Sequence, residues 1–131
     1  MTVGNTKIDR NVKEEDLRDA GLISEADYCD KIKNEHYYES TINKPVIIWG
    51  ERWKVKVSFE YNDCKDFCYC ATILSLYKPE DEKKDFLLMK AYGQKAFGTA
   101  HRKDSTEYIF ENKKNVYLRK RSSVWLLIVS S

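Results

Sequence analysis

Residues 52–61, with the sequence RWKVKVSFEY, alternate strictly between polar and apolar side chains. Because successive residues of a strand point to opposite faces of a sheet, this period of two predicts a strand with one buried and one solvated face. Sheets with one solvated face are typically antiparallel. The stretch therefore favours an antiparallel sheet over a helical bundle.

Apolar stretches on either side extend this sheet. Residues 67–77 are apolar at positions of both parities, which is typical of a central strand covered on both faces. The turn-forming sequence at residues 62–65 separates this stretch from the alternating one. Residues 46–49 form a short apolar run ended by Gly50, which predicts a strand or a segment leading into one.

The C-terminal part of the chain predicts further strands. We expect them at residues 107–110, 116–118 and 124–129, with turns at 111–115 and at Ser122-Ser123. Between these strands and the central one, Pro79 and the acids after it are typical of a helix start. Residues 80–97 therefore predict one further helix, with a strand over 86–92 as the alternative because Gly93 weakens a helix.

The N-terminal third is acidic and predicts two short helices. Leu17 and Ala20 share one face of the first helix, and Gly21 follows where a left-handed C-terminal cap is favoured. Ser24 and Asp27 stand where a second helix would be capped and where its positive end would be stabilised. Ala26, Cys29 and Ile32 then recur at helical spacing.

The sequence Gly21-Leu22-Ile23-Ser24-Glu25, followed by the aromatic Tyr28, resembles the short helical hairpin of SHOCT-type domains. The resemblance covers residues 14–36. It implies an element for docking or oligomerisation and carries over no catalytic residue.

Together these patterns predict an α+β fold, in which an N-terminal helical hairpin precedes a largely antiparallel sheet of five or six strands. We divide the chain into an acidic hairpin at residues 1–43 and a basic sheet domain at 44–131. The first part carries six basic and ten acidic residues, and the second carries 17 basic and 11 acidic ones. The net charge of +2 therefore conceals a −4 region and a +6 region, and the acidic hairpin could pack on the basic sheet and neutralise it.

Composition excludes several classes of protein. With 131 residues, 42% of them hydrophobic and 34% charged, the chain predicts one globular domain rather than a disordered or collagen-like chain. No leader peptide and no stretch of about 20 apolar residues is visible, so we expect a cytoplasmic protein that does not contact a membrane.

The four cysteines are Cys29, Cys64, Cys68 and Cys70. The last three lie at spacings that place them on one face of one strand, and this is not the usual spacing of a zinc site. We interpret them as reduced, partly buried thiols, with a metal site completed by Cys29 or His36, or a redox pair, as alternatives. The sequence predicts no cofactor.

Basic residues interspersed with aromatic ones are the strongest functional signal. If the fold gathers them on one surface, they would attract phosphates or anchor a partner protein, since Tyr and Arg dominate binding hot spots. A solvated sheet face with no function is the alternative. The candidate binding residues are Lys54, Lys56, Arg102, Lys103, Lys113, Lys114, Tyr117, Arg119, Lys120 and Arg121.

Catalytic signals are weak. His36 and His101 lie in separate regions, and no serine stands in a nucleophile elbow. Glu111 and Lys113 have the Glu-x-Lys spacing of metal-dependent nucleases, with Asp104 as a possible second metal ligand. Similar three-residue matches arise often by chance in a highly charged chain.

We therefore expect a non-enzymatic binding protein that acts by occupying a partner. A small inhibitor or adaptor that binds a protein is the first hypothesis, and an antagonist of host defence encoded by a phage or mobile element would have this form. A nucleic-acid or nucleotide binder is the second, and a metal-dependent nuclease is the third. A homodimer could form through the N-terminal hairpin or through a strand edge.

Overall fold

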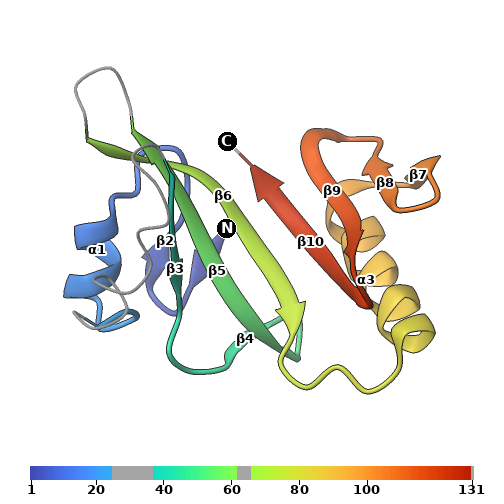
Figure 1. Ribbon diagram of the computed structural model, residues 1–131, viewed down its shortest axis with the longest axis horizontal. Helices are drawn as coiled ribbons and strands as arrows, with labels where there is room; N and C mark the ends of the chain where they lie inside the picture. The colour runs from blue at the N-terminus through green and yellow to red at the C-terminus, as the bar shows by residue number, and fades with distance from the viewer. Residues whose placement is uncertain (25–36, 62–65, 131) are drawn as a thin grey trace.

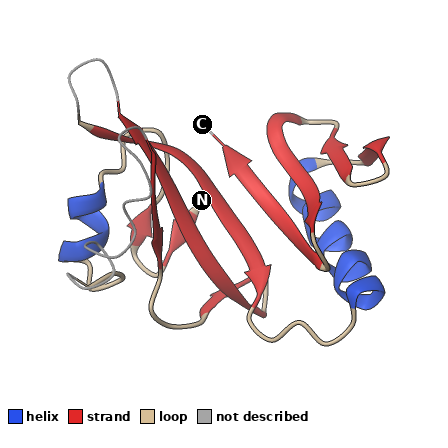
Figure 2. Cartoon of the chain, in the orientation of Figure 1, coloured by secondary structure: helices blue, strands red, loops and turns tan. Residues whose placement is uncertain are grey.

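The computed structural model describes residues 1–24, 37–61 and 66–130. Most of these residues lie in strands, and Figure 2 shows two helices at opposite ends of a large sheet. None of the described helices is long and apolar enough to cross a membrane.

An eight-stranded antiparallel sheet is the main feature of the fold. Seven strands follow the order β3-β5-β6-β10-β9-β8-β7, and the short β4 pairs with the start of β5, on the same edge as β3. The strands are β3 (Tyr37–Thr41), β4 (Val46–Ile48), β5 (Glu51–Tyr61), β6 (Phe67–Leu76), β7 (Ala100–Asp104), β8 (Glu107–Phe110), β9 (Lys113–Arg121) and β10 (Val124–Ser130). The alternating stretch is β5, and the stretch expected to be central is β6, which lies between β5 and β10.

The helix α3 (Glu82–Phe97) connects β6 to the far edge of the sheet. The Asp81 side chain caps it by accepting a hydrogen bond from the Lys84 backbone N–H at 2.9 Å. The prediction of a helix at residues 80–97 is thereby confirmed, and the strand alternative is wrong. The apolar side chains of residues 86–92 recur at helical spacing and pack on the sheet: Phe86 contacts Trp125, and Tyr92 contacts Trp53.

The N-terminal segment differs from the prediction. It begins with a small hairpin of β1 (Thr2–Val3) and β2 (Thr6–Lys7), which turns at Gly4 with a φ of 60°. A six-residue helix, α1 (Glu14–Asp19), follows. Figure 1 shows α1 at the end of the sheet opposite to α3, with the N-terminus nearer the middle of the sheet. The residues of the expected second helix, 25–36, lie outside the described part of the chain.

The predicted fold class is therefore corrected from α+β with a helical hairpin to a mostly β fold. The hairpin is not seen, and the sheet has eight strands rather than five or six. Leu17 is fully buried, as expected for the apolar face of the first helix, but Ala20 is exposed and lies at the C-cap rather than in the helix. The helix is short because the chain turns at Gly21, with a φ of 73°, and enters a loop in which Leu22 and Ile23 are buried.

The two faces of the sheet have different surroundings. On one face, which we call the covered face, a row of residues runs in register across five strands: Val55, Leu74, Leu127, Leu118 and Tyr108. This face packs against α3 and against the N-terminal segment, whose Val3, Ile8, Val12 and Leu17 join the same hydrophobic cluster. The opposite face, which we call the open face, carries none of the described helices.

Candidate functional site

The open face gathers part of the predicted basic and aromatic set. A row of residues runs across it from β5 to β7, one position along each strand from the covered row. In register, this open row consists of Lys56, Ile73, Ile128, Tyr117, Ile109 and His101. Lys54, Arg119 and Arg121 lie two or four residues along the strands from members of this row and therefore share its face.

Four residues of the open face form a compact group, which we call the Tyr117–Arg119 patch: Ile109, Tyr117, Arg119 and Leu126. Tyr117 lies opposite Ile109, and Arg119 lies opposite Leu126. Ile109 is 39% exposed, and the other three are partly exposed. The patch therefore presents an aromatic ring, a guanidinium group and two aliphatic side chains to solvent.

Arg119 is held in place by two neighbours. Its guanidinium Nη2 lies 3.1 Å from Oε1 of Glu107, and its Cζ lies 5.8 Å from the centre of the Tyr117 ring. Glu107 is only 7% exposed, and its second oxygen lies 3.9 Å from Nζ of Lys103. A charged group fixed in this way loses less conformational entropy when it binds a partner.

The remaining predicted basic residues do not join this patch. Lys120, which lies between Arg119 and Arg121 in sequence, is on the covered side and forms an ion pair with Glu82 of α3. Arg102 lies opposite Tyr108 of the covered row and donates from Nε to the backbone oxygen of Asp104 at 3.2 Å. Lys54 and Lys56 share the open face, but β5 is three strand spacings from β9, or roughly 14 Å.

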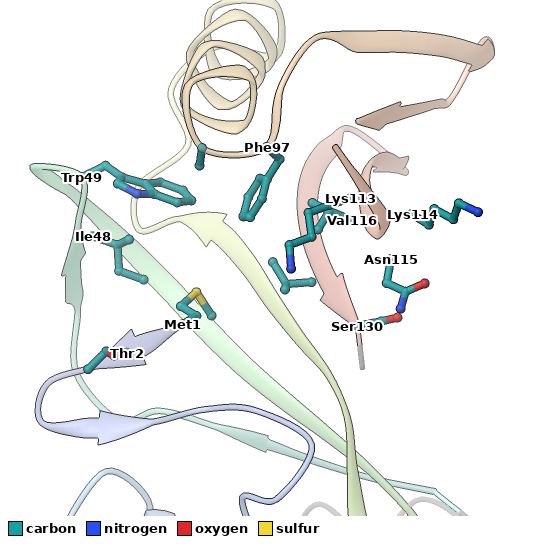
Figure 3. Close-up of a pocket in the computed structure, with 12 residues that line it drawn as sticks. Met1, Thr2, Ile48, Trp49, Phe97, Lys113, Lys114, Asn115, Val116 and Ser130 are labelled. Carbon is teal, nitrogen blue, oxygen red and sulfur yellow. The ribbon is translucent and has the colours of Figure 1, made fainter. Parts of the chain in front are cut away.

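Lys113 and Lys114 lie elsewhere again, at the start of β9. Both border a cavity on the covered side of the sheet, between β1, the end of α3 and the strands β9 and β10. Figure 3 shows the nitrogen of Lys113 turned into this cavity and the side chain of Lys114 pointing away from it. Neither lysine contributes to the open face patch.

The residues of the nuclease hypothesis are separated. Asp104 lies opposite Glu107 at one end of β8, and Glu111 follows the other end of that strand. Four residues of extended chain separate the Cα atoms of Glu107 and Glu111 by roughly 13 Å, and neither Asp104 nor Glu111 belongs to a described group of three or more side chains that could hold a metal ion. Asp104 instead accepts hydrogen bonds from the backbone N–H of Thr106 at 2.8 Å and from its hydroxyl, and these lower the pKa of the carboxyl group.

The described cysteines belong to β6. Cys68 is exposed and Cys70 is half-buried, so the expectation of partly buried thiols holds for Cys70 and is wrong for Cys68. Burial, with the carboxylate of Glu60 nearby, raises the pKa of Cys70 to about 11, which makes it a poor nucleophile. Cys29, Cys64 and His36 lie outside the described residues. Among those that are described, no group of three or more His, Cys, Asp and Glu side chains could hold a metal ion.

Sequence reasoning missed a polar cluster at the β3 end of the open face. The Tyr37 hydroxyl donates to Oε1 of Glu39 at 2.7 Å and lies 2.9 Å from Oγ of Ser58, which is 1% exposed. Burial raises the pKa of Tyr37 to about 12, and the Glu39 carboxylate acts in the same direction. Because Tyr37 stays protonated at neutral pH, its phenol supplies a hydrogen bond and does not act as a base.

Comparison with known proteins gives no relative. No family model matches the chain, and neither the curated proteins nor the solved structures contain a match. The resemblance to SHOCT-type domains is therefore not supported, in agreement with the short N-terminal helix.

Proposed function

We propose that the chain is a non-enzymatic binding protein that acts by occupying a partner protein through the Tyr117–Arg119 patch. The observation that carries the proposal is the fixed position of Arg119 between the Glu107 carboxylate and the Tyr117 ring. Tyr and Arg are enriched in the residues that dominate protein interfaces, particularly where they are held rigidly.

The surroundings of Arg119 favour a protein partner over a nucleic acid. Glu107 already neutralises part of the charge of Arg119, and Lys120 is engaged by Glu82 on the other side of the sheet. Between Arg119 and the lysines of β5, the open row consists of Ile128 and Ile73. Along the described open row, a phosphate backbone would therefore find the cations of β5 and β9 separated by two isoleucines.

The chemistry of the partner follows from the patch. An apolar side chain of the partner would pack beside Tyr117 and Ile109, and a carboxylate would accept from the N–H groups of Arg119 that Glu107 leaves unused. A stable interface buries about 800 Å² on each partner, so it would extend across β10 and β6 toward Lys56. By binding there, the chain would block the partner's own contact surface, as an inhibitor or adaptor does.

The proposal includes a cytoplasmic location, where the thiols of Cys68 and Cys70 would stay reduced. The proposed mechanism does not depend on the kind of organism or mobile element that encodes the protein. An antagonist of host defence would use the same occupancy mechanism.

A quantitative capture experiment tests the proposal. The immobilised protein is incubated with cell extract, washed at low and at high salt, and compared with the double variant Tyr117→Ala/Arg119→Ala. Loss of two hot-spot residues should weaken binding of a captured protein by about 100-fold or more. The matched control is Lys83→Ala/Lys95→Ala, which removes two exposed charges of α3 and should leave capture unchanged.

Two outcomes would contradict the proposal. One is capture of the same proteins at equal levels by both double variants. The other is recovery of nucleic acid alone, released by high salt, since phosphate contacts weaken steeply with salt. Light scattering of the purified protein identifies a second copy of the chain as the occupant if the molecular mass falls in the patch variant only.

A further inference from the structure

A cavity of about 470 Å³ lies on the side of the sheet opposite to the Tyr117–Arg119 patch. It opens between the N-terminal strand β1 and the C-terminal end of α3, and β9 and β10 form its floor. This volume is within the range of about 300–1,000 Å³ that is typical of small-molecule sites. The cavity is therefore large enough for an organic ligand with one or two rings.

The walls of the cavity are mostly apolar. Ile48 and Trp49 lie on one side of the cavity, and Phe97, the last residue of α3, lies on another. Val116 of β9 and Val129 of β10 form its floor. Asn115 and Ser130 add polar groups at one side. An apolar cavity with few polar groups binds a ligand by burying its hydrophobic body and fixing its orientation at a small number of points.

Trp49 is an unusual residue for its backbone position. Trp49 and Gly50 are the two central residues of the turn between β4 and β5, with φ values of 54° and 77°. Turns of this kind strongly prefer Asn or Gly at the first position, and a bulky residue with positive φ is strained. Strained positions persist where the surrounding structure enforces them and occur often at ligand sites.

Contacts with other aromatic rings hold the strained tryptophan. Its ring stacks on Tyr92 at 6.0 Å with an interplanar angle of 14°, and meets the edges of Trp53 and Phe97 at 6.0 and 6.2 Å. The residue is nevertheless 37% exposed. A rigid and accessible indole ring at the cavity wall is a surface on which a flat ligand can stack.

Lys113 sets the charge that the ligand should carry. Its nitrogen turns into the cavity in Figure 3, and no described carboxylate forms an ion pair with it. Lys113 is exposed, so its ammonium group can meet an anion bound in the cavity with the strength of a surface ion pair. The adjacent Lys114 points away and provides a natural comparison.

We propose that this cavity is a binding site for a small organic anion with a flat apolar body, such as an aryl carboxylate or sulfonate. The apolar body would lie against Trp49 and Phe97, and the anionic group would meet the ammonium of Lys113. This site is independent of the proposed function, since none of its residues belongs to the open face patch.

A pair of fluorescent probes with matched shapes tests the site. The anionic probe is 8-anilinonaphthalene-1-sulfonate, and N-phenyl-1-naphthylamine has nearly the same rings without the charge. The wild-type protein should bind the anionic probe about 2–5-fold more tightly than the neutral one, because an ion pair with an exposed lysine is a weak contact. Lys113→Gln should remove this preference, and Lys114→Gln should retain it.

A second variant tests the cavity without changing its charge. Ala96, at the cavity wall, is exposed on the last turn of α3, so Ala96→Trp can fill the space without entering the core. It should weaken the binding of both probes by about 10-fold or more. Circular dichroism and thermal unfolding identify variants that fail to fold, since loosened proteins also bind these probes.

Three results would overturn the inference. The first is the absence of saturable probe binding to the folded wild-type protein. The second is equal affinity of Lys113→Gln and Lys114→Gln for the anionic probe. The third is probe binding that Ala96→Trp leaves unchanged. None of these results bears on the Tyr117–Arg119 patch, whose capture experiment is separate.

Discussion

The covered row and the open row of the sheet run across the same strands, one residue apart, and have different roles. Val55, Leu74, Leu127 and Leu118 of the covered row are fully buried. On the open row, Ile73 and Ile128 are 7% exposed and do not belong to the core cluster, and Ile109 is 39% exposed. The open row is therefore also apolar over its middle, but no described helix packs on it.

This difference separates stability from binding in the same strands. Side chains on the covered row are packed by α3 and by the N-terminal segment, so their removal should destabilise the fold. Ile73 and Ile128 in the middle of the open row are themselves buried, whereas Lys54, Lys56 and Ile109 are exposed and are therefore free to contact a partner. Substitutions at neighbouring positions of one strand should consequently have very different effects.

The largest expected effect is at Trp53, which is fully buried and donates from Nε1 to the backbone oxygen of Ile48 at 2.9 Å. Trp53→Ala should lower the free energy of unfolding by about 3–5 kcal/mol, because it leaves a cavity under α3. Urea titration measures the change. The adjacent open-face substitution Lys54→Ala should change stability by only about 0.5 kcal/mol or less, and an equal loss at both positions would contradict the distinction between the faces.

A smaller effect is expected at Gly93 in α3. A β-carbon at this position would lie 2.4 Å from Cζ of Phe110, so Gly93→Ala forces the ring on β8 to move. We expect a loss of about 1–3 kcal/mol by urea titration, although alanine is the better helix former by about 1 kcal/mol. In a Phe110→Leu background the same substitution should cost less. Stabilisation by Gly93→Ala in the otherwise unchanged protein would mean that α3 does not approach β8 this closely.

At alkaline pH, the stability of the fold should depend on Tyr37, which lies on the open face. Its pKa is raised to about 12, so the folded state keeps the phenol neutral while an unfolded chain ionises near pH 10. This contribution to stability is complete below pH 10 and is lost as the pH rises toward 12.

Urea titrations between pH 9 and 12 check this expectation. Stability should fall less steeply in Tyr37→Phe than in the unsubstituted protein, by up to about 1–2 kcal/mol at pH 12 after allowance for the half-buried ring. Cys70→Ala is the companion variant, because the Cys70 thiol has a pKa of about 11 and contributes a loss that begins near pH 9. Parallel curves for all three proteins would show that the polar cluster has no effect on folding.

The smallest effect on stability is expected within the patch. Ile109→Ser replaces a side chain that is 39% exposed and should change the free energy of unfolding by about 0.5 kcal/mol or less. The same variant should weaken capture of the partner, because it removes an apolar contact beside Tyr117. A large loss of stability would place Ile109 in the core.

Much of the sheet could be predicted from the sequence. The period of two at residues 52–61 and the apolar run at 67–77 identified β5 and β6. The order of polar and apolar residues along a strand indicates which of its faces are buried. β7 was not predicted because its sequence, Ala-His-Arg-Lys-Asp, has no alternation of polar and apolar residues. An edge strand can consist largely of charged residues. β1 and β2 have two residues each, which is too short for any periodic signal.

The candidate site was predicted only in part. The basic residues 119–121 were expected to lie on one surface. Because side chains alternate along β9, Lys120 lies on the opposite face from Arg119 and Arg121. The period of two could have shown this separation once β9 was identified. Whether Lys113 lies in a cavity depends on the distant residues Trp49 and Phe97, so local sequence carries no signal for it.

The place of β10 in the strand order has a consequence for how the fold is completed. β10 lies between β6 and β9, and its Leu127 pairs with Leu74 on one side and with Leu118 on the other. Until residues 124–130 have left the ribosome, β3 to β6 and β7 to β9 are two separate ladders with no strand to join them. The pairing of β10 with β9 is a local hairpin, but its pairing with β6 is distant along the chain, and such pairings form slowly. During synthesis, the facing edges of β6 and β9 therefore stay unpaired until the strand that joins them emerges.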